Sequence, residues 1–232
     1  VQGGAAARRA GNPGARRSGA GSRGSGTAVT VSLRWLGGGG FTLRVGRRVL
    51  ALDPCLGRLA GAEAGRRGAG PDELRLGLAL PWCDCILVSG GSMERLADVQ
   101  CVARLTGALV AAPPDACRSL ALLGLPAGQV RPMRPGSTLP VGCFAIEALP
   151  ARRAGHDLGF RVRAGLITML TNCAAEAPSH PRADIVLAGP RDRRGVLARA
   201  LAAARPRLVV ACRTETAWRR SPPRPGAGER RV

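Results

Sequence analysis

Short apolar runs that end at glycine, proline or aspartate recur along this sequence, and they constrain its fold more than any other feature. In residues 29–36, apolar side chains alternate with Thr30, Ser32 and Arg34, the two-residue period of a strand with one buried face. Residues 85–88 are continuously apolar, which is typical of a strand buried on both faces. No apolar stretch reaches the roughly 18–20 residues that a membrane-spanning helix needs.

Two strand–helix–strand segments lie among these strands. Leu96, Val99, Val102 and Leu105 have helical spacing, which predicts a helix over 93–106; further helices are expected over 114–123 and 194–204. Strands are expected at residues 29–36, 41–45, 49–52, 85–88, 108–112, 129–133, 137–139, 143–149, 158–163, 166–170, 183–187 and 208–211. Residues 57–79 are interpreted as a loop with a short helical turn near 71–74. This order predicts an α/β fold, a sandwich of two mixed sheets flanked by helices, with Trp35 and Phe41 in its core.

The charge is concentrated at the ends of the chain. The formal net charge is +20, and all 35 basic residues are arginine. Residues 1–27 hold five Arg and no acid, and residues 219–232 hold five Arg and one Glu. We therefore expect residues 28–218 to form the domain, residues 1–27 to be a basic tail or transit remnant, and residues 219–232 to be a second basic tail. Arginine without lysine indicates codon bias, which weakens an argument for nucleic-acid binding from charge alone.

The cysteines and serines give no clear catalytic motif. The eight cysteines include no CxxC pair, so buried thiols in a reducing compartment are expected. Gly37–Gly40 is interpreted as a turn, because no Gly-Lys-Ser/Thr follows it. Ser89, Ser92 and Ser119 have no partnered histidine, and Cys173 has no identified base.

Several strings, in this order, resemble the metallo-β-lactamase fold, in particular its ascorbate-6-phosphate lactonase-like branch. The strings are Trp35-Leu36-Gly37 with Phe41, 49–54 (Val-Leu-Ala-Leu-Asp-Pro), 84–89 (Asp-Cys-Ile-Leu-Val-Ser), 134–137 (Arg-Pro-Gly-Ser), 183–187 (Ala-Asp-Ile-Val-Leu) and 205–210 (Arg-Pro-Arg-Leu-Val-Val). They extend over about residues 28–217, and the fit is closest to divergent plastid and cyanobacterial members. The resemblance implies the αββα sandwich of that family.

The resemblance also implies where metal ligands would stand, and this sequence departs from the family there. The matching positions are Gly38, Gly90, Ser92, Glu94, Arg95, Arg153, Asn172 and Arg213, so no histidine remains at any of them. Arginine keeps its proton and cannot bind a cation. His156 and His180 are the only histidines, too few to rebuild a dinuclear site, although a register shift would bring His156 onto one family position. No catalytic residue, metal ligand or cofactor is therefore predicted.

The leading hypothesis is a catalytically inactive metallo-β-lactamase-fold protein that serves as a scaffold or binding subunit of a plastid assembly, with a mitochondrion or the cytoplasm as alternative locations. Its expected partners are other protein subunits, and RNA or another anionic surface through the Arg-rich tails. Two alternatives stay open. One is a divergent hydrolase or lactonase, metal-dependent or metal-free, with an anion pocket formed by Arg95, Arg153 and Arg213. The other is an organelle RNA-associated basic protein.

Overall fold

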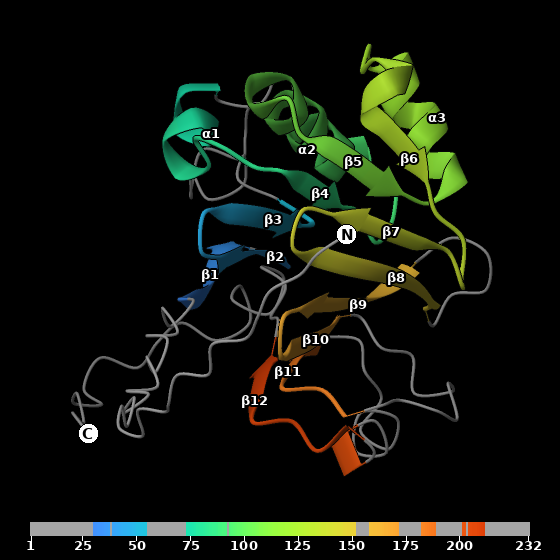
Figure 1. Ribbon diagram of the computed structural model, residues 1–232. Helices are drawn as coiled ribbons and strands as arrows, with labels where there is room; N and C mark the ends of the chain where they lie inside the picture. Colours follow the sequence, from blue (N-terminus) through green and yellow to red (C-terminus); the bar gives the residue numbers. More distant parts are fainter. Residues whose placement is uncertain are drawn as a thin grey trace, which may run out of the picture.

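The computed structural model describes residues 30–37, 39–54, 73–91, 93–151, 158–171, 182–188, 201–202 and 204–211. Both predicted tails lie outside these residues, as do most of the predicted third helix and residues 55–72. Figure 1 shows the described part as two sheets with helices on their outer sides. None of the helices in these ranges is long and apolar enough to span a membrane.

The first sheet contains strands from the amino-terminal half, in the order β1-β2-β3-β4-β5-β6. Their bounds are β1 (Val31–Gly37), β2 (Gly40–Val45), β3 (Arg48–Leu52), β4 (Cys85–Leu87), β5 (Leu109–Ala112) and β6 (Val130–Pro132). The pairs β1–β2 and β2–β3 are antiparallel, and β3, β4, β5 and β6 run parallel. The sheet is therefore mixed, as the sequence pattern predicted.

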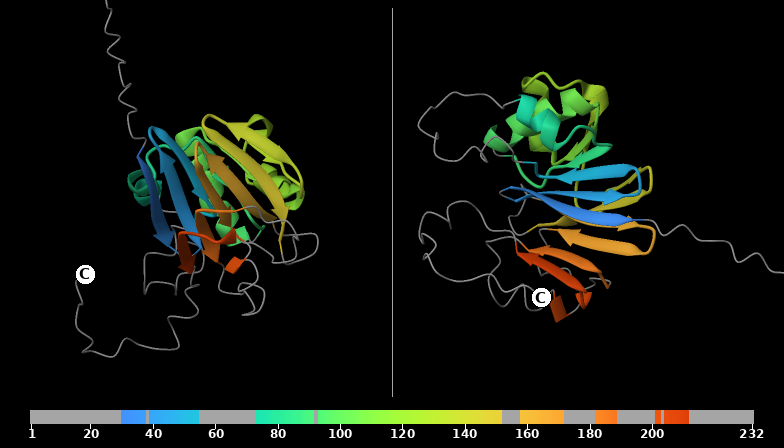
Figure 2. Two further views of the ribbon diagram at one scale, coloured as in Figure 1. Left: turned by 60° about the horizontal axis from the view of Figure 1, so that its bottom comes forward. Right: turned by 90° about the vertical axis from the view of Figure 1, so that its left-hand side faces the viewer.

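The second sheet has the order β12-β11-β10-β9-β8-β7. Its strands are β7 (Thr138–Val141), β8 (Phe144–Pro150), β9 (Leu158–Ala164), β10 (Ile167–Thr171), β11 (Ile185–Ala188) and β12 (Leu208–Ala211). The strands from β7 to β10 pair antiparallel, whereas β10, β11 and β12 are parallel. Figure 2 shows the two sheets face to face, with β1 and β12 on the same side of the sandwich.

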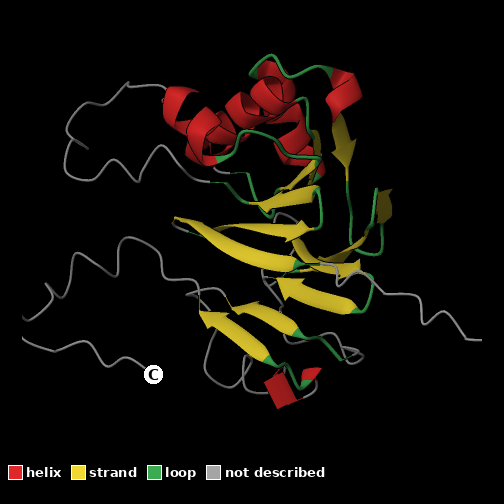
Figure 3. Cartoon of the chain, turned by 60° about the vertical axis from the view of Figure 1, so that its left-hand side comes forward, coloured by secondary structure: helices red, strands yellow, loops and turns green. Residues whose placement is uncertain are grey.

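Helices cover the outer faces. The helices α1 (Glu73–Ala79), α2 (Met93–Thr106) and α3 (Pro114–Leu122) lie together on the first sheet, as Figure 3 shows, and the short 3-10 helix η1 (Ala127–Gln129) precedes β6. Their buried side chains pack with alternate residues of β3, β4 and β5, including Val49, Ile86 and Val110. On the second sheet, Leu201 and Ala204 pack near Leu170 and Val186. The predicted layering, helices outside two mixed sheets, is confirmed.

The main core lies between the sheets. Leu43, Leu50 and Leu87 from the first sheet pack in one cluster with Phe144 and Phe160 from the second, and all five are at most 1% exposed. The apolar residues of β8 and β9 alternate into this cluster, which explains the alternation in the sequence.

Two sequence-based expectations are wrong. Trp35 was assigned to the core, but its exposed fraction is 56%, because β1 is an edge strand and its end is not covered. Residues 73–79, interpreted as part of a loop, form helix α1, which packs beside α2. Phe41, in contrast, is buried as predicted.

An aspartate before a parallel strand performs the same structural role in both halves. The Asp84 carboxylate precedes β4 and accepts a hydrogen bond from the Val49 backbone N–H at 2.7 Å. Asp184 precedes β11 and accepts one from the Thr168 N–H at 2.9 Å. Each aspartate therefore fixes its parallel strand to the start of the neighbouring strand.

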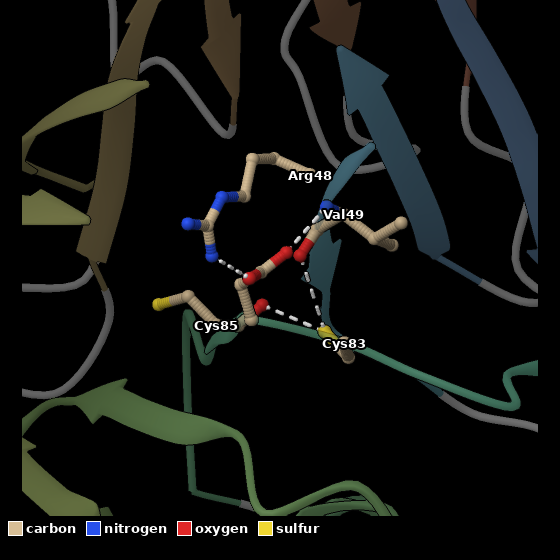
Figure 4. Close-up of polar contacts among 5 residues, drawn as sticks. Arg48, Val49, Cys83 and Cys85 are labelled. Carbon is tan, nitrogen blue, oxygen red and sulfur yellow. Dashed lines mark hydrogen bonds and ion pairs between the residues drawn. The ribbon is translucent and has the colours of Figure 1, made fainter. Parts of the chain in front are cut away.

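Asp84 accepts a second hydrogen bond, from a side chain, in addition to the one from the Val49 N–H. Arg48 donates to its second oxygen at 2.6 Å, and this hydrogen bond raises the pKa of the Arg48 guanidinium (Figure 4). The neighbouring Cys83 and Cys85 side chains point to opposite sides of the chain, Cys83 toward the helices and Cys85 into the core between the sheets. The Cys83 thiol donates to the Cys85 carbonyl at 3.0 Å.

The five described cysteines are free thiols, and they support the prediction of scattered, mostly buried thiols. Cys83, Cys85 and Cys101 are buried, Cys117 is partly buried and Cys143 is exposed. Burial raises the pKa of the Cys83 thiol to about 12, and it also raises the pKa of the Cys85 thiol.

Replacing Asp84 by alanine should lower the free energy of unfolding by about 2–3 kcal/mol, because it leaves the buried Val49 N–H without its acceptor. The ion pair itself contributes little, since the Arg48 side chain is 56% exposed. Asp184→Ala removes one hydrogen bond and should cost about 1–2 kcal/mol. Urea unfolding of both variants measures the difference; changes below about 0.5 kcal/mol in both would contradict this role of the aspartates.

Candidate functional site

The candidate site is the edge at which strands of both sheets end. Strands β3 and β4 are parallel and end at Leu52 and Leu87, so the residues that follow them meet at one edge of the first sheet. The Leu158 N–H at the start of β9 donates to the Ser89 carbonyl at 2.7 Å. Because β9 pairs antiparallel with β10, this contact brings the end of β10 to the same edge.

Asp53 and Ser89 join the strand ends in the first sheet. The Ser89 backbone N–H donates to one Asp53 carboxylate oxygen at 2.8 Å, and the Ser89 hydroxyl donates to the other at 2.5 Å. The Asp53 N–H donates to the Leu87 carbonyl at 2.9 Å. Asp53 and Ser89 are 5% and 7% exposed, so these bonds form away from bulk water.

The backbone at Asp53 is held in a left-handed conformation, with φ at 42°. Aspartate tolerates this region better than most residues, because its short side chain can form local hydrogen bonds. Here the bonds to Ser89 hold the side chain, and the following residue is Pro54. The chain therefore turns sharply at the end of β3, and its carboxylate points at the loop after β4.

Thr171 is the last residue of β10, the strand of the second sheet that ends at this edge. It is completely buried at the end of β10, and its hydroxyl oxygen accepts a hydrogen bond from the Phe160 N–H at 3.2 Å. This bond joins the end of β10 to β9 beside the predicted position Asn172.

The structure describes only part of the predicted site. Gly90 is buried directly after Ser89, at this edge. Glu94 and Arg95 lie in the first turn of α2, which starts at Met93. The other predicted positions are Gly38, Ser92, Arg153, Asn172 and Arg213, and all of these fall outside the described residues, as do His156, His180 and Cys173. The proximity of the three arginines therefore stays a prediction.

Among the residues described at this edge, few side chains are of the types that ligate metal ions. Gly90 has no side chain to offer, and both oxygens of Asp53 accept hydrogen bonds from Ser89. Within the described ranges, no group of three or more His, Cys, Asp or Glu residues is placed to hold a metal ion. A dinuclear zinc or iron site needs several nitrogen, sulfur or carboxylate ligands.

The contact between Asp53 and Ser89 was not predicted from the sequence. Asp53 entered the sequence analysis only as part of the string 49–54, and Ser89 only as a serine without a partnered histidine. A signal was present, since each follows an apolar strand and parallel strands end at the same edge of a sheet. The resemblance placed its candidate positions after Ser89, at Gly90 and beyond.

Solved structures with this arrangement of sheets are similar to the chain over most of its length. CmlA, a diiron beta-hydroxylase from Streptomyces venezuelae, matches with a TM-score of 0.57 and 19% identity over 80% of this chain. Igni18, a metallo hydrolase from Ignicoccus hospitalis, matches with a TM-score of 0.55 and 16% identity, covering 78% of this chain and 82% of its own. The metallo-beta-lactamase fold protein YhfI from Bacillus subtilis gives 0.52 and 16%, covering 78% and 85%.

These likenesses and the two six-stranded sheets define the metallo-β-lactamase fold, the αββα sandwich that the sequence resemblance implied. No protein-family model matches the sequence, and no curated protein matches it by sequence. The chain spans 45% of the CmlA chain that it matches. The likenesses therefore establish the fold, and the activity must be argued from this chain's own residues.

Proposed function

We propose that this chain is a metallo-β-lactamase-fold protein without metal-dependent hydrolytic activity that serves as a binding subunit of a larger protein assembly. The observation that carries the proposal is the chemistry of the edge where the strands end. There, Asp53 directs both oxygens to Ser89, and Gly90 follows without a side chain. The arginines at positions 95, 153 and 213 support it further, because a guanidinium group repels a cation.

The finer parts of the proposal rest on the sequence strings. Membership of the ascorbate-6-phosphate lactonase-like branch, and a location in a plastid, follow from those strings together with the Arg-rich residues 1–27. The fold supplies rigid edges and faces on which partner proteins could dock.

Metal analysis tests the proposal. Purified protein is equilibrated with Zn²⁺, Mn²⁺ or Fe²⁺ under reducing conditions, desalted and measured for metal per chain. We expect far less than one metal ion per chain, because the positions that the resemblance aligns with metal ligands hold no histidine and include three arginines. A Cys143→Ala variant controls for metal held loosely by this exposed thiol. Near-stoichiometric metal that persists in this variant, with metal-dependent hydrolysis of a lactone or phosphoester, would contradict the proposal.

A further inference from the structure

The first strand of the sandwich forms an open edge. Strand β1 lies at the end of its sheet and, among the described residues, pairs with β2 alone. It has seven residues, long enough to support another strand. Figure 2 shows this edge on the side of the sandwich that also carries β12.

The register of β1 shows which backbone groups face outward. The Gly46 N–H donates to the Thr30 carbonyl at 3.0 Å, so Thr30 and Gly46 form a hydrogen-bonded pair. In an antiparallel ladder such pairs alternate, which directs the backbone groups of Ser32 and Arg34 to β2. The N–H and carbonyl groups of Val31 and Leu33 therefore point away from the sheet, toward the position of a further strand.

Partly exposed apolar side chains lie beside the outward-pointing N–H and carbonyl groups of β1. Val31 and Leu33 are only partly buried where they pack on the core between the sheets. Trp35, on the same face of β1, is 56% exposed, and Leu208 and Val209 on the edge strand β12 are 46% and 43% exposed. An added strand could bury apolar residues on this side of the sandwich.

The other face of β1 and β2 is positively charged. Arg34 and Arg44 are exposed. Arg34 donates to the Ala79 carbonyl at 3.2 Å, and the Arg44 guanidinium lies 5.3 Å from the centre of the Trp82 ring. Among the described residues, neither guanidinium group forms an ion pair with a carboxylate, and both side chains are exposed on this face.

We propose that β1 is a docking edge for an extended acidic segment of a partner protein, which adds to the sheet as a strand. The segment would place apolar residues beside Val31, Leu33 and Trp35, and carboxylates beside Arg34. The inference builds on the proposed binding function and assigns it a surface and a partner chemistry. A second copy of this chain fits less well, because it also has a net charge of +20 and would bring another Arg34 to the same edge.

The experiment measures binding of a fluorescently labelled peptide of about nine residues that alternates valine with glutamate. Fluorescence anisotropy is followed at physiological salt with the full-length chain. Leu33→Pro removes an outward N–H without breaking the ladder to β2, and it should weaken binding about tenfold or more. Leu33→Ala is the matched control that loses the side chain and keeps the N–H, so it should bind more tightly than Leu33→Pro.

Two further arms address charge and folding. Arg34→Glu should weaken binding of the valine–glutamate peptide about fivefold or more and favour a valine–lysine peptide instead. Peptides methylated on either the valine or the glutamate amide nitrogens test strand addition with the protein unchanged: one methylated peptide should lose binding and the other keep it. The methylated peptides test whether the segment adds to β1 as a strand even if the Leu33→Pro variant does not fold.

Equal binding of both methylated peptides, or no effect of Arg34→Glu, would overturn the proposal. Dimers in sedimentation that exclude the peptide, or displacement of the peptide by single-stranded RNA with the same dependence on residue 33, would also overturn it. The metal analysis can fail separately: near-stoichiometric metal with metal-dependent hydrolysis would contradict the proposed function and leave the peptide result standing.

Discussion

Raising the pH from 9 to 11 should destabilise the folded protein by about 5 kcal/mol, mainly through Cys83 and Cys85. Burial raises the pKa of the Cys83 thiol from its ordinary 9.0 to about 12, and burial also raises the pKa of Cys85. Above pH 9 the unfolded chain loses these protons while the folded protein keeps them. Stability is therefore complete below pH 9 and falls as the pH rises toward 12, by about 1.4 kcal/mol per pH unit for each thiol.

The composition limits this pH dependence to the cysteines, and burial also raises the pKa of the Cys101 and Cys117 thiols. The chain has no tyrosine and no lysine, so in this range no other type of side chain begins to titrate. Urea unfolding in a reducing buffer at several pH values measures the slope. Cys85→Ala should make the slope clearly less steep, because it removes one of the two most strongly shifted thiols. Equal slopes in wild type and Cys85→Ala would contradict the assignment.

Phe160→Ala should lower the free energy of unfolding by about 3–5 kcal/mol. Phe160 is completely buried between the two sheets, in the cluster that contains Leu87 and Phe144. Its removal leaves a cavity that neighbouring side chains can fill only in part, since strands hold them on both sides. The midpoint of chemical unfolding measures the loss.

The matched control lies on the neighbouring hairpin. Leu166, between β9 and β10, is 98% exposed, so Leu166→Ala should change stability by less than about 0.5 kcal/mol. A loss in Phe160→Ala as small as that in Leu166→Ala would mean that the core between the sheets is less tightly packed than the burial of Phe160 indicates.

Much of the fold could be predicted because local pattern and tertiary burial agree. The alternation in residues 143–149 and 158–163 corresponds to β8 and β9, and the helical spacing from Leu96 to Leu105 corresponds to α2. Trp35 was misplaced because its exposure depends on the order of strands in the sheet, which no local pattern contains. Helix α1 was predicted only as a short turn near 71–74, because its short sequence follows a Gly- and Arg-rich stretch.

The candidate site was harder to predict for a similar reason. The strand β4 before Gly90 was predictable, since its apolar run is unambiguous in the sequence. The bond between Asp53 and Ser89 joins residues 36 positions apart, and only the parallel pairing of β3 with β4 brings them together. Residue types indicate what each group can do, whereas sheet topology decides which groups meet.

The paired roles of Asp84 and Asp184 also bear on the path by which the chain folds. Asp84 reaches back 35 residues to Val49, whereas Asp184 reaches back only 16 residues to Thr168. The entropy lost on closing a loop grows with the logarithm of its length, so the second closure costs about 0.7 kcal/mol less. The two halves are alike in their hydrogen bonding, but chain entropy favours early assembly of the carboxyl-terminal half.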